Sequence, residues 1–572
     1  YWNGRLLIDC TLLVQTITND NPELPLLIYG TCHVPNPLAI EPGTTLKFLP
    51  TMESSNPMLS GESVEAGMLD IGGAIIAPGA SPEERITFTS VRDDSVGGDS
   101  NPGEGEVAPA ILDWRGVVAV EGNEAESRVT YCDFRYADMP LKISGNPDPA
   151  SNGELRALAF VDGCRFENNG NGPWLDYCYL DNIGMNEETV APEHMQGVKY
   201  RGTRFSNCHI RSERLHTQPG GIPYIFAGLI MVPEGCSLTI DSDVIVKFDI
   251  DKVDDGDSNT YDLPAGKLKV DGYLLAPGNP ENGIVFTSLK DDSVWGDSNP
   301  GYVPAPGESS EPAADDWHGI ELDKTQEKII SHCRIAYAHH GIEFLGSTGI
   351  VTTCEIRHCW NGIAIDAENI TGCIEVIDNK VWGCREGDGN GIWIRKNGNI
   401  VLARNECYDN GCGMRISEGS YQIRNNDIHN NYTGIYANKL GLGASIIRNR
   451  VYSNEYVGID LINSDYIVSH NEIGLVDVAP PPGIGGECYG LYIHQSEGNH
   501  VPIVTKNLIQ YNRQGLYIGC DSQQVVYANK IRNNTNAGVI ADNPTKALDL
   551  CVMFLVNGEE KFRGNDITDN DD

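Results

Sequence analysis

The sequence predicts an all-β solenoid, a right-handed parallel β-helix with an internally duplicated, β-rich lead module. Three observations predict it. A glycine followed by an apolar residue recurs along the second half of the chain, an asparagine ladder accompanies it, and one block of sequence occurs twice. The 572 residues are too many for one ordinary globular core, and internal repetition of this kind is typical of stacked coils.

The recurring glycines each open a short stretch in which apolar and polar residues alternate. They lie 21 to 32 residues apart, as from Gly341 to Gly362 and from Gly458 to Gly490. The full series is Gly341, Gly362, Gly391, Gly413, Gly434, Gly458, Gly490, Gly515 and Gly538. Because alternation places successive side chains on opposite faces of a strand, each step predicts one coil with an apolar inner face and a polar outer face.

The second ladder consists of asparagines, each two residues before an apolar one. Its members are Asn379, Asn405, Asn426, Asn449, Asn471, Asn507 and Asn529. We expect these amides to stack at a bend of the coils and to satisfy backbone groups buried there. A helical solenoid would need long stripes of period 3.6 instead.

In earlier coils a cysteine takes the position of this asparagine, two residues before an apolar one, as at Cys132, Cys164, Cys333 and Cys354. Adjacent parallel strands are about 4.8 Å apart, a separation that a disulfide tolerates. We therefore predict disulfides among these four cysteines, and a further one that joins Cys10 to Cys32. The alternative is a stack of buried thiols that pack as small apolar groups.

The duplicated block recurs at an offset of roughly 200 residues. Lys47-Phe48 matches Lys247-Phe248, and Asp113-Trp114 matches Asp316-Trp317. The chain is therefore predicted to contain four segments: a lead module over residues 1–126, coils over 127–215, a second lead module over 216–325 and the main coils over 326–572.

Composition narrows the class of protein. Eighty acidic residues against 41 basic ones give a formal net charge of −39, which excludes nucleic acids and anionic membranes as partners. No segment is apolar for long enough to span a bilayer, and no haem or nucleotide motif occurs. The 17 cysteines and the start at Tyr1 without a leader favour a processed, secreted protein that is extracellular or on a cell surface.

The coils resemble the pectate-lyase-like superfamily of right-handed parallel β-helices, whose bends carry stacked asparagines. The lead module, with its Phe-Thr-Ser run and the Asp-Asp-Ser-Val and Gly-Asp-Ser-Asn-Pro motifs, resembles a segment of large secreted bacterial β-helix surface proteins. The resemblance covers nearly the whole chain as architecture. It does not select an activity, because this superfamily includes lyases, hydrolases, epimerases and adhesins.

Acidic loops of the lead modules are candidate calcium sites. The loop residues Asp93, Asp94, Asp99 and Asn101 recur as Asp291, Asp292, Asp297 and Asn299, and a third loop holds Asp254, Asp255 and Asp257. Carboxylate and amide oxygens are the ligands that Ca²⁺ prefers. Since solvated turns are rich in the same residues, the sequence leaves both interpretations open.

An outward stripe on the glycine-led strands is a candidate glycan-binding surface. It comprises Asp366, Trp393, Arg395, Arg415, Tyr436, Asp460, Tyr492, His494 and Tyr517. Glu343 and Asn438 are expected on the same outward face. Aromatic rings pack on sugar faces, and arginines bind hydroxyl or carboxylate groups. Exposed strands carry such residues for stability alone as well. Consecutive histidines such as His339 and His340 point to opposite faces of a strand, so no metal site is predicted there or at Asp316-Trp317-His318.

These observations favour a non-catalytic structural or adhesive protein, a surface or filament component that calcium and disulfides stabilise and that binds glycan along the stripe. Self-association by stacking of terminal coils is part of this prediction. The alternative is a polysaccharide lyase or glycoside hydrolase that acts on a linear glycan along the same face. No catalytic motif selects this alternative, so no catalytic residue is assigned from the sequence.

Overall fold

A computed structural model describes most of the chain. The described residues are 3–18, 24–51, 65–102, 107–120, 126–145, 156–191, 198–250, 266–300, 302–304, 309–324, 326–366, 372–385, 389–396, 398–441, 443–474, 489–494, 501–519, 525–542, 552–556, 559–563, 565–568 and 570. They form two compact units. Unit 1 comprises residues 1–276 and 281–312, and unit 2 comprises residues 277–280 and 313–572. The four segments predicted from the sequence remain a prediction.

Unit 1 consists of parallel strands that contribute in turn to different sheets, with three strands in a typical coil. The first sheet ends at β18, and from β21 on a fourth sheet takes its strand of each coil. Its first sheet contains β1 (Arg5–Ile8), β3 (Leu26–Tyr29), β6 (Thr45–Phe48), β9 (Ile86–Ser90), β12 (Cys132–Arg135), β15 (Arg165–Glu167) and β18 (Glu187–Thr189). Its second contains β4 (Thr31–Val34), β7 (Met68–Ile71), β10 (Trp114–Val120), β13 (Ala137–Ser144), β16 (Trp174–Asp176), β19 (Thr203–Ser206), β22 (Tyr224–Ala227), β25 (Ile245–Phe248) and β28 (Ile284–Ser288).

The third sheet of unit 1 contains β2 (Thr16–Ile17), β5 (Leu38–Ile40), β8 (Ile75–Pro78), β11 (Glu126–Thr130), β14 (Ala157–Asp162), β17 (Cys178–Ile183), β20 (His209–Ile210), β23 (Leu229–Val232) and β26 (Lys267–Val270). A fourth contains β21 (Ser212–Leu215), β24 (Ser237–Ile240) and β27 (Tyr273–Pro277). One short 3₁₀ helix, η2, spans Pro219–Gly221. Among the described residues no helix is long and apolar enough to cross a membrane.

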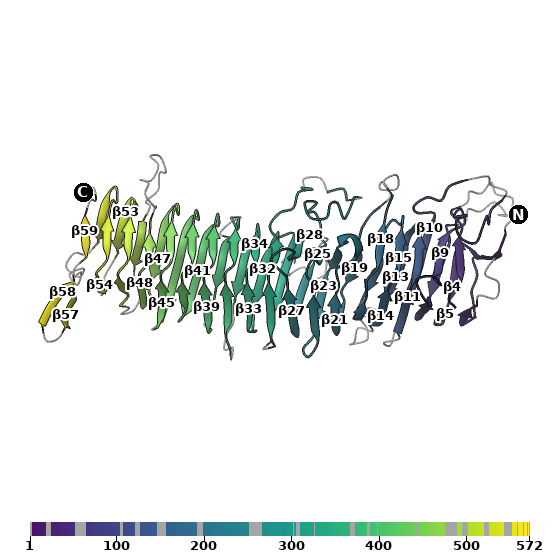
Figure 1. The fold of residues 1–572 in the computed structure, drawn as a ribbon, viewed down its shortest axis with the longest axis horizontal. Coiled ribbons are helices and arrows are strands. Elements are labelled where there is room, and N and C mark those ends of the chain that lie inside the picture. Colours follow the sequence, from purple (N-terminus) through teal and green to yellow (C-terminus); the bar gives the residue numbers. More distant parts are fainter. Residues whose placement is uncertain are drawn as a thin grey trace, which may run out of the picture. The chain divides into compact units, whose positions relative to one another are not determined.

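Unit 2 repeats a coil of three strands, and Figure 1 shows its strands, green to yellow, stacked in order. The strands that contain the recurring glycines belong, together with β29, to one sheet, which we call the site sheet. Its strands are β29 (Trp317–Leu322), β32 (Ala338–Phe344), β35 (Asn361–Ile365), β38 (Asn390–Ile394), β41 (Cys412–Gly419), β44 (Thr433–Leu440), β47 (Val457–Ile462), β50 (Tyr489–His494), β53 (Gln514–Ile518) and β56 (Ala537–Ala541).

The next strand of each coil belongs to the second sheet: β30 (Lys328–Ser331), β33 (Gly349–Thr352), β36 (Ile374–Ile377), β39 (Ile400–Ala403), β42 (Gln422–Arg424), β45 (Ala444–Ile447), β48 (Tyr466–Ser469), β51 (Ile503–Thr505) and β54 (Val525–Tyr527). The third sheet of unit 2 contains β31 (Cys333–Ala336), β34 (Glu355–Arg357), β37 (Lys380–Trp382), β40 (Glu406–Tyr408), β43 (Asp427–His429), β46 (Arg450–Tyr452), β49 (Glu472–Ile473), β52 (Leu508–Gln510), β55 (Lys530–Arg532) and β59 (Asp566–Thr568). An antiparallel hairpin joins β57 (Val552–Val556) to β58 (Glu559–Arg563).

The strand pairs inside each of the three sheets of unit 2 are parallel, as in β38–β41, β39–β42 and β40–β43. Connections between parallel strands of one sheet are right-handed as a rule. The predicted fold, a right-handed parallel β-helix, is therefore confirmed.

The recurring glycines of the site sheet are required by close approach of the coils. A Cβ atom placed on Gly413 would lie 2.7 Å from the carbonyl oxygen of Gly434, and one on Gly434 would lie 2.3 Å from that of Gly458. No other residue fits such contacts, so the glycines persist from coil to coil. The apolar residue that follows each one points inward and stacks in register, as Ile392, Met414 and Ile435 do, and these side chains are fully buried.

Candidate functional site

One row of outward side chains runs along the site sheet of unit 2. Register places Glu321, Glu343, Ala364, Trp393, Arg415, Tyr436, Asp460, Tyr492 and Tyr517 on successive strands of this outward row. Six residues of the predicted stripe therefore share it. The other three lie beside it: His494 ends β50, and Asp366 and Arg395 follow β35 and β38 directly. The row begins with two carboxylates: Glu343, which the sequence also places on this outward face, and Glu321, which the sequence prediction missed.

Glu321 and Glu343 are paired side by side on β29 and β32 and are only 5% and 8% exposed. One side-chain atom each from His318, Glu321 and Glu343 lie within 4.8 Å of one another. We call these three residues the acid–histidine cluster. Carboxylate and imidazole groups also bind metals, and among the described residues this cluster has the spacing to hold a metal ion.

An arginine joins the cluster to the predicted stripe. The Arg395 guanidinium donates to Glu343 Oε1 at 2.6 Å, and its Nε lies 3.4 Å from Asp366 Oδ2. To reach Glu343 it spans β35, whose outward side chain is only the small Ala364. The Arg395 guanidinium therefore gives the Glu343 carboxylate a positively charged hydrogen-bond donor.

His340 lies behind the cluster as a neutral imidazole. Its Nε2 is 3.6 Å from Glu343 Oε1, and its Nδ1 lies 3.2 Å from Asn361 Nδ2. Burial lowers the pKa of His340 to about 3. The ring therefore stays uncharged at neutral pH and helps to position Glu343 without adding a charge.

A repeated tetrapeptide is the sequence signal for this cluster. His-Gly-Ile-Glu occurs at 318–321 and again at 340–343. A register shift after Gly319 keeps the two glutamates paired while Gly319, not His318, pairs with His340. The prediction of no metal site at Asp316-Trp317-His318 compares residues adjacent in sequence only, whereas the fold brings His318 close to Glu321 and Glu343.

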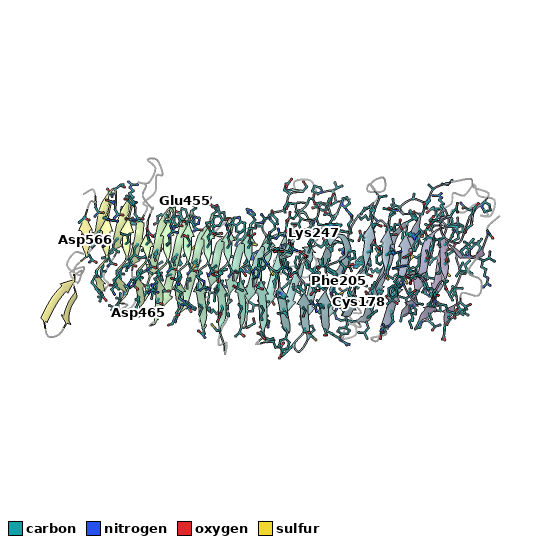
Figure 2. The ribbon with its side chains drawn as sticks, viewed as in Figure 1. Cys178, Phe205, Lys247, Glu455, Asp465 and Asp566 are labelled. Atoms are coloured by element: carbon teal, nitrogen blue, oxygen red, sulfur yellow. The ribbon has the colours of Figure 1, made fainter. Side chains whose placement is uncertain are left out.

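The duplicated acidic loops of unit 1 each surround a buried lysine. Lys47 Nζ donates to the carbonyl oxygens of Asp93 and Gly98 at 2.9 and 2.6 Å. In the second copy Lys247 Nζ donates to those of Asp291 and Gly296, both at 2.9 Å, and Figure 2 marks Lys247. Burial lowers the pKa of Lys247 to about 8.

The acidic side chains of these loops bond mainly within the loop. Asp93 and Asp291 each accept from a threonine hydroxyl at 2.7 Å. Asp99 and Asp297 accept from the backbone N–H groups of Asn101 and Asn299. Calcium at Asp93, Asp94, Asp99, Asn101, Asp291, Asp292, Asp297 and Asn299 stays a prediction, and Asp254, Asp255 and Asp257 lie outside the described residues.

The predicted disulfides are wrong, because Cys10, Cys32, Cys132, Cys164, Cys333 and Cys354 are all free thiols. The Sγ atoms of Cys10 and Cys32 are 3.4 Å apart, well beyond a covalent S–S bond of about 2.05 Å. The cysteines at the asparagine positions of the coils instead donate to backbone carbonyl oxygens, as Cys132 does to Ala77 at 3.3 Å and Cys354 to Thr352 at 3.3 Å. The spacing of the strands does not fix the direction of the Sγ atoms, and here the thiols point at buried carbonyl oxygens.

The asparagines predicted to stack form a continuous hydrogen-bonded ladder in unit 2, between the second and third sheets of that unit. Both the backbone N and Nδ2 of Asn405 donate to Asn426 Oδ1, at 2.9 and 3.1 Å. The same pattern runs through Asn379, Asn405, Asn426, Asn449, Asn471, Asn507 and Asn529. A second ladder between the third sheet and the site sheet includes Asn410, Asn431 and Asn454, and the sequence prediction missed it.

Comparison with known proteins supports the architecture. Residues 313–473 match the family model of the right-handed β-helix region. The solved structure of the periplasmic alginate epimerase AlgG is 14% identical, with a TM-score of 0.35 over 63% of this chain and 82% of that one. The A-module of the mannuronan C-5 epimerase AlgE6 from Azotobacter vinelandii is 12% identical, with a TM-score of 0.15 over 90% and 91%. No curated protein matches the sequence significantly.

These comparisons correct one interpretation. The comparisons contradict the prediction of a non-catalytic structural or adhesive protein, because the similar solved structures are epimerases, which are enzymes. At TM-scores below 0.5 these likenesses place no residue and no substrate, so the site is argued from the geometry of unit 2.

Proposed function

We propose that this chain, whose residues 313–473 match the right-handed β-helix family model, is an enzyme that cleaves a linear polysaccharide lying along the outward row of unit 2. The observation that carries the proposal is the in-register pair of buried carboxylates, Glu321 and Glu343, in the acid–histidine cluster. A polysaccharide substrate places its action outside the cytoplasm, in the periplasm or the extracellular space.

Paired carboxyl groups about 5 Å apart suit hydrolysis of a glycosidic bond by way of a covalent intermediate. Glu343, which accepts a hydrogen bond from Arg395 at 2.6 Å, is the proposed nucleophile that attacks the anomeric carbon. Glu321 is the proposed proton donor to the departing oxygen. Glu321 then takes a proton from the water that releases the sugar from Glu343, which restores both carboxyl groups.

The rest of the outward row supports binding of an extended chain. Aromatic rings recur along the row: Trp393, Tyr436 and Tyr492 lie on every second strand. Tyr492 and Tyr517 lie on adjacent strands about 4.8 Å apart. A second candidate reaction is β-elimination at an acidic sugar, in which an arginine neutralises the sugar carboxylate, a carboxylate side chain takes the α-proton and the glycosidic oxygen leaves. Arg395 and Glu343, 2.6 Å apart, offer these two groups together. Elimination leaves an unsaturated sugar, whereas hydrolysis does not.

Two conservative variants test the catalytic pair. We expect Glu343→Gln and Glu321→Gln each to lower kcat at least 100-fold in a reducing-end assay, because each removes a proton-transfer or nucleophilic group. The matched control is Glu355→Gln on the exposed face of β34, which should retain activity. Full activity in both cluster variants would refute the assignment, and ultraviolet absorbance of the products separates hydrolysis from elimination.

A further inference from the structure

A pocket of about 420 Å³ lies in unit 2 beside the outward row. Its lining includes Arg385, Asn390, Arg415, Tyr432, Tyr436 and Glu455. In Figure 2 Glu455 marks the edge of the coils opposite to Asp465. Arg415 is three strands along the row from Glu343, which corresponds to about 14 Å at the usual strand spacing. The pocket is therefore separate from the acid–histidine cluster but on the same path.

The two arginines of the pocket differ in their partners. Arg385 is held by Glu455 at 3.3 Å and Asp409 at 3.8 Å. Arg415 makes no ion pair with any residue that the structure describes, and its guanidinium carbon lies 5.2 Å from the centre of the Tyr436 ring. A partly buried guanidinium without a counter-ion favours binding of an anionic group.

Asn390 supplies an unfilled acceptor at the same pocket. Its side chain is only 4% exposed, and its backbone N and Nδ2 both donate to Asn361 Oδ1, at 3.1 and 2.8 Å. Its own Oδ1 is buried without a hydrogen-bond partner. The next coil holds Cys412 in that position, and the Cys412 N–H donates to Gly389 instead.

A buried acceptor without a donor is destabilising, so an unsatisfied group of this kind calls for an explanation such as a bound ligand. Because Asn390 Oδ1 has almost no accessible surface, a hydroxyl group in the pocket gives it a donor once the Asn390 side chain turns toward the pocket. Tyr432, which is 55% exposed, and Tyr436 supply rings against which a sugar packs.

We infer that this pocket is a binding subsite for one sugar unit that bears an anionic group, a carboxylate or a sulfate ester. Arg415 binds the anionic group, and Asn390 Oδ1 accepts a hydrogen bond from a ring hydroxyl. The inference rests on the proposed function for the polymer to which this unit belongs. It specifies an acidic polysaccharide as the substrate, although the whole chain carries a net charge of −39.

Isothermal titration of the full chain tests the subsite with three probes: a galacturonic acid tetramer, a sulfated galactose tetramer and a neutral galactose tetramer. We expect an anionic tetramer to bind at least tenfold more tightly than the neutral one. Arg415→Met should abolish that difference, and Arg415→Lys should retain part of it. Which anionic tetramer binds distinguishes carboxylate from sulfate.

The matched control is Arg450→Met on the third sheet, where Arg450 pairs with Asp427 at 3.1 Å and lies outside the pocket. Asn390→Ala should weaken anionic binding at least threefold, with far-UV circular dichroism to verify the fold. Equal binding of all three tetramers, or anionic binding that Arg415→Met leaves unchanged, would overturn the subsite. Arg415-dependent binding without cleavage of any polymer would instead overturn the proposed function and leave the subsite in place.

Discussion

At the scale of single residues, Lys47 is the side chain whose removal tests the lead module. It is fully buried, and its ammonium group bonds two loop carbonyls. Lys47→Met keeps the length of the side chain but leaves both carbonyls without a donor and the acidic loop without its cation. We expect a loss of about 2–4 kcal/mol in the free energy of unfolding, measured by urea titration.

The control for that loss is Lys199→Met in the same unit. Lys199 is exposed and pairs with Asp138 at 3.1 Å, and a surface pair of this kind contributes at most about 1 kcal/mol. Equal stabilities of Lys47→Met and Lys199→Met would contradict the structural role of the buried ammonium group.

At the scale of structural elements, the asparagine ladder holds the bends of unit 2. Asn426 accepts from both nitrogens of Asn405 and donates to Leu402 O and Asn449 Oδ1. Asn426→Ala leaves these buried groups unsatisfied, so we expect a loss of about 2–4 kcal/mol. Gln422→Ala on the exposed face of β42 should change stability little. Denaturant unfolding of both variants measures the difference, and matching curves would refute the role of the ladder.

The elements that recur were predictable from the sequence, and the contacts that break the recurrence were not. Gly413 and Gly434 repeat because each coil approaches the next too closely for a Cβ atom, so period alone identified the coil. The pairing of Glu321 with Glu343 depends on a register shift after Gly319. The unfilled acceptor of Asn390 depends on Cys412 in the following coil. Such features need the strand register, which a single sequence does not supply.

At the scale of the whole molecule, buried thiols set the response to alkaline pH. Burial raises the pKa of Cys359 and of Cys412 to about 12, and it raises the pKa of Cys132 and Cys384 well above its usual range. The unfolded chain loses these protons from about pH 9 while the folded chain keeps them. Stability is therefore fully present below pH 9 and falls above it, by roughly 1.4 kcal/mol per pH unit for each thiol.

Lys247 acts in the opposite direction, because its pKa of about 8 makes the unfolded chain bind more protons between about pH 8 and 10.5. The thiols outnumber it, so we expect the melting temperature to fall between pH 9 and pH 11. Calorimetry across this range measures the effect, with Cys359→Ala expected to reduce the slope. A melting temperature that rises over the same range would contradict this account.

The central claim is that unit 2 is an enzyme acting on a linear polysaccharide, and an end-group assay on a panel of acidic and neutral polymers tests it most directly. The account predicts that the purified full chain releases new reducing ends from an acidic polymer and that Glu343→Gln does not. Folded protein that releases neither reducing ends nor unsaturated products from any polymer of the panel would contradict it.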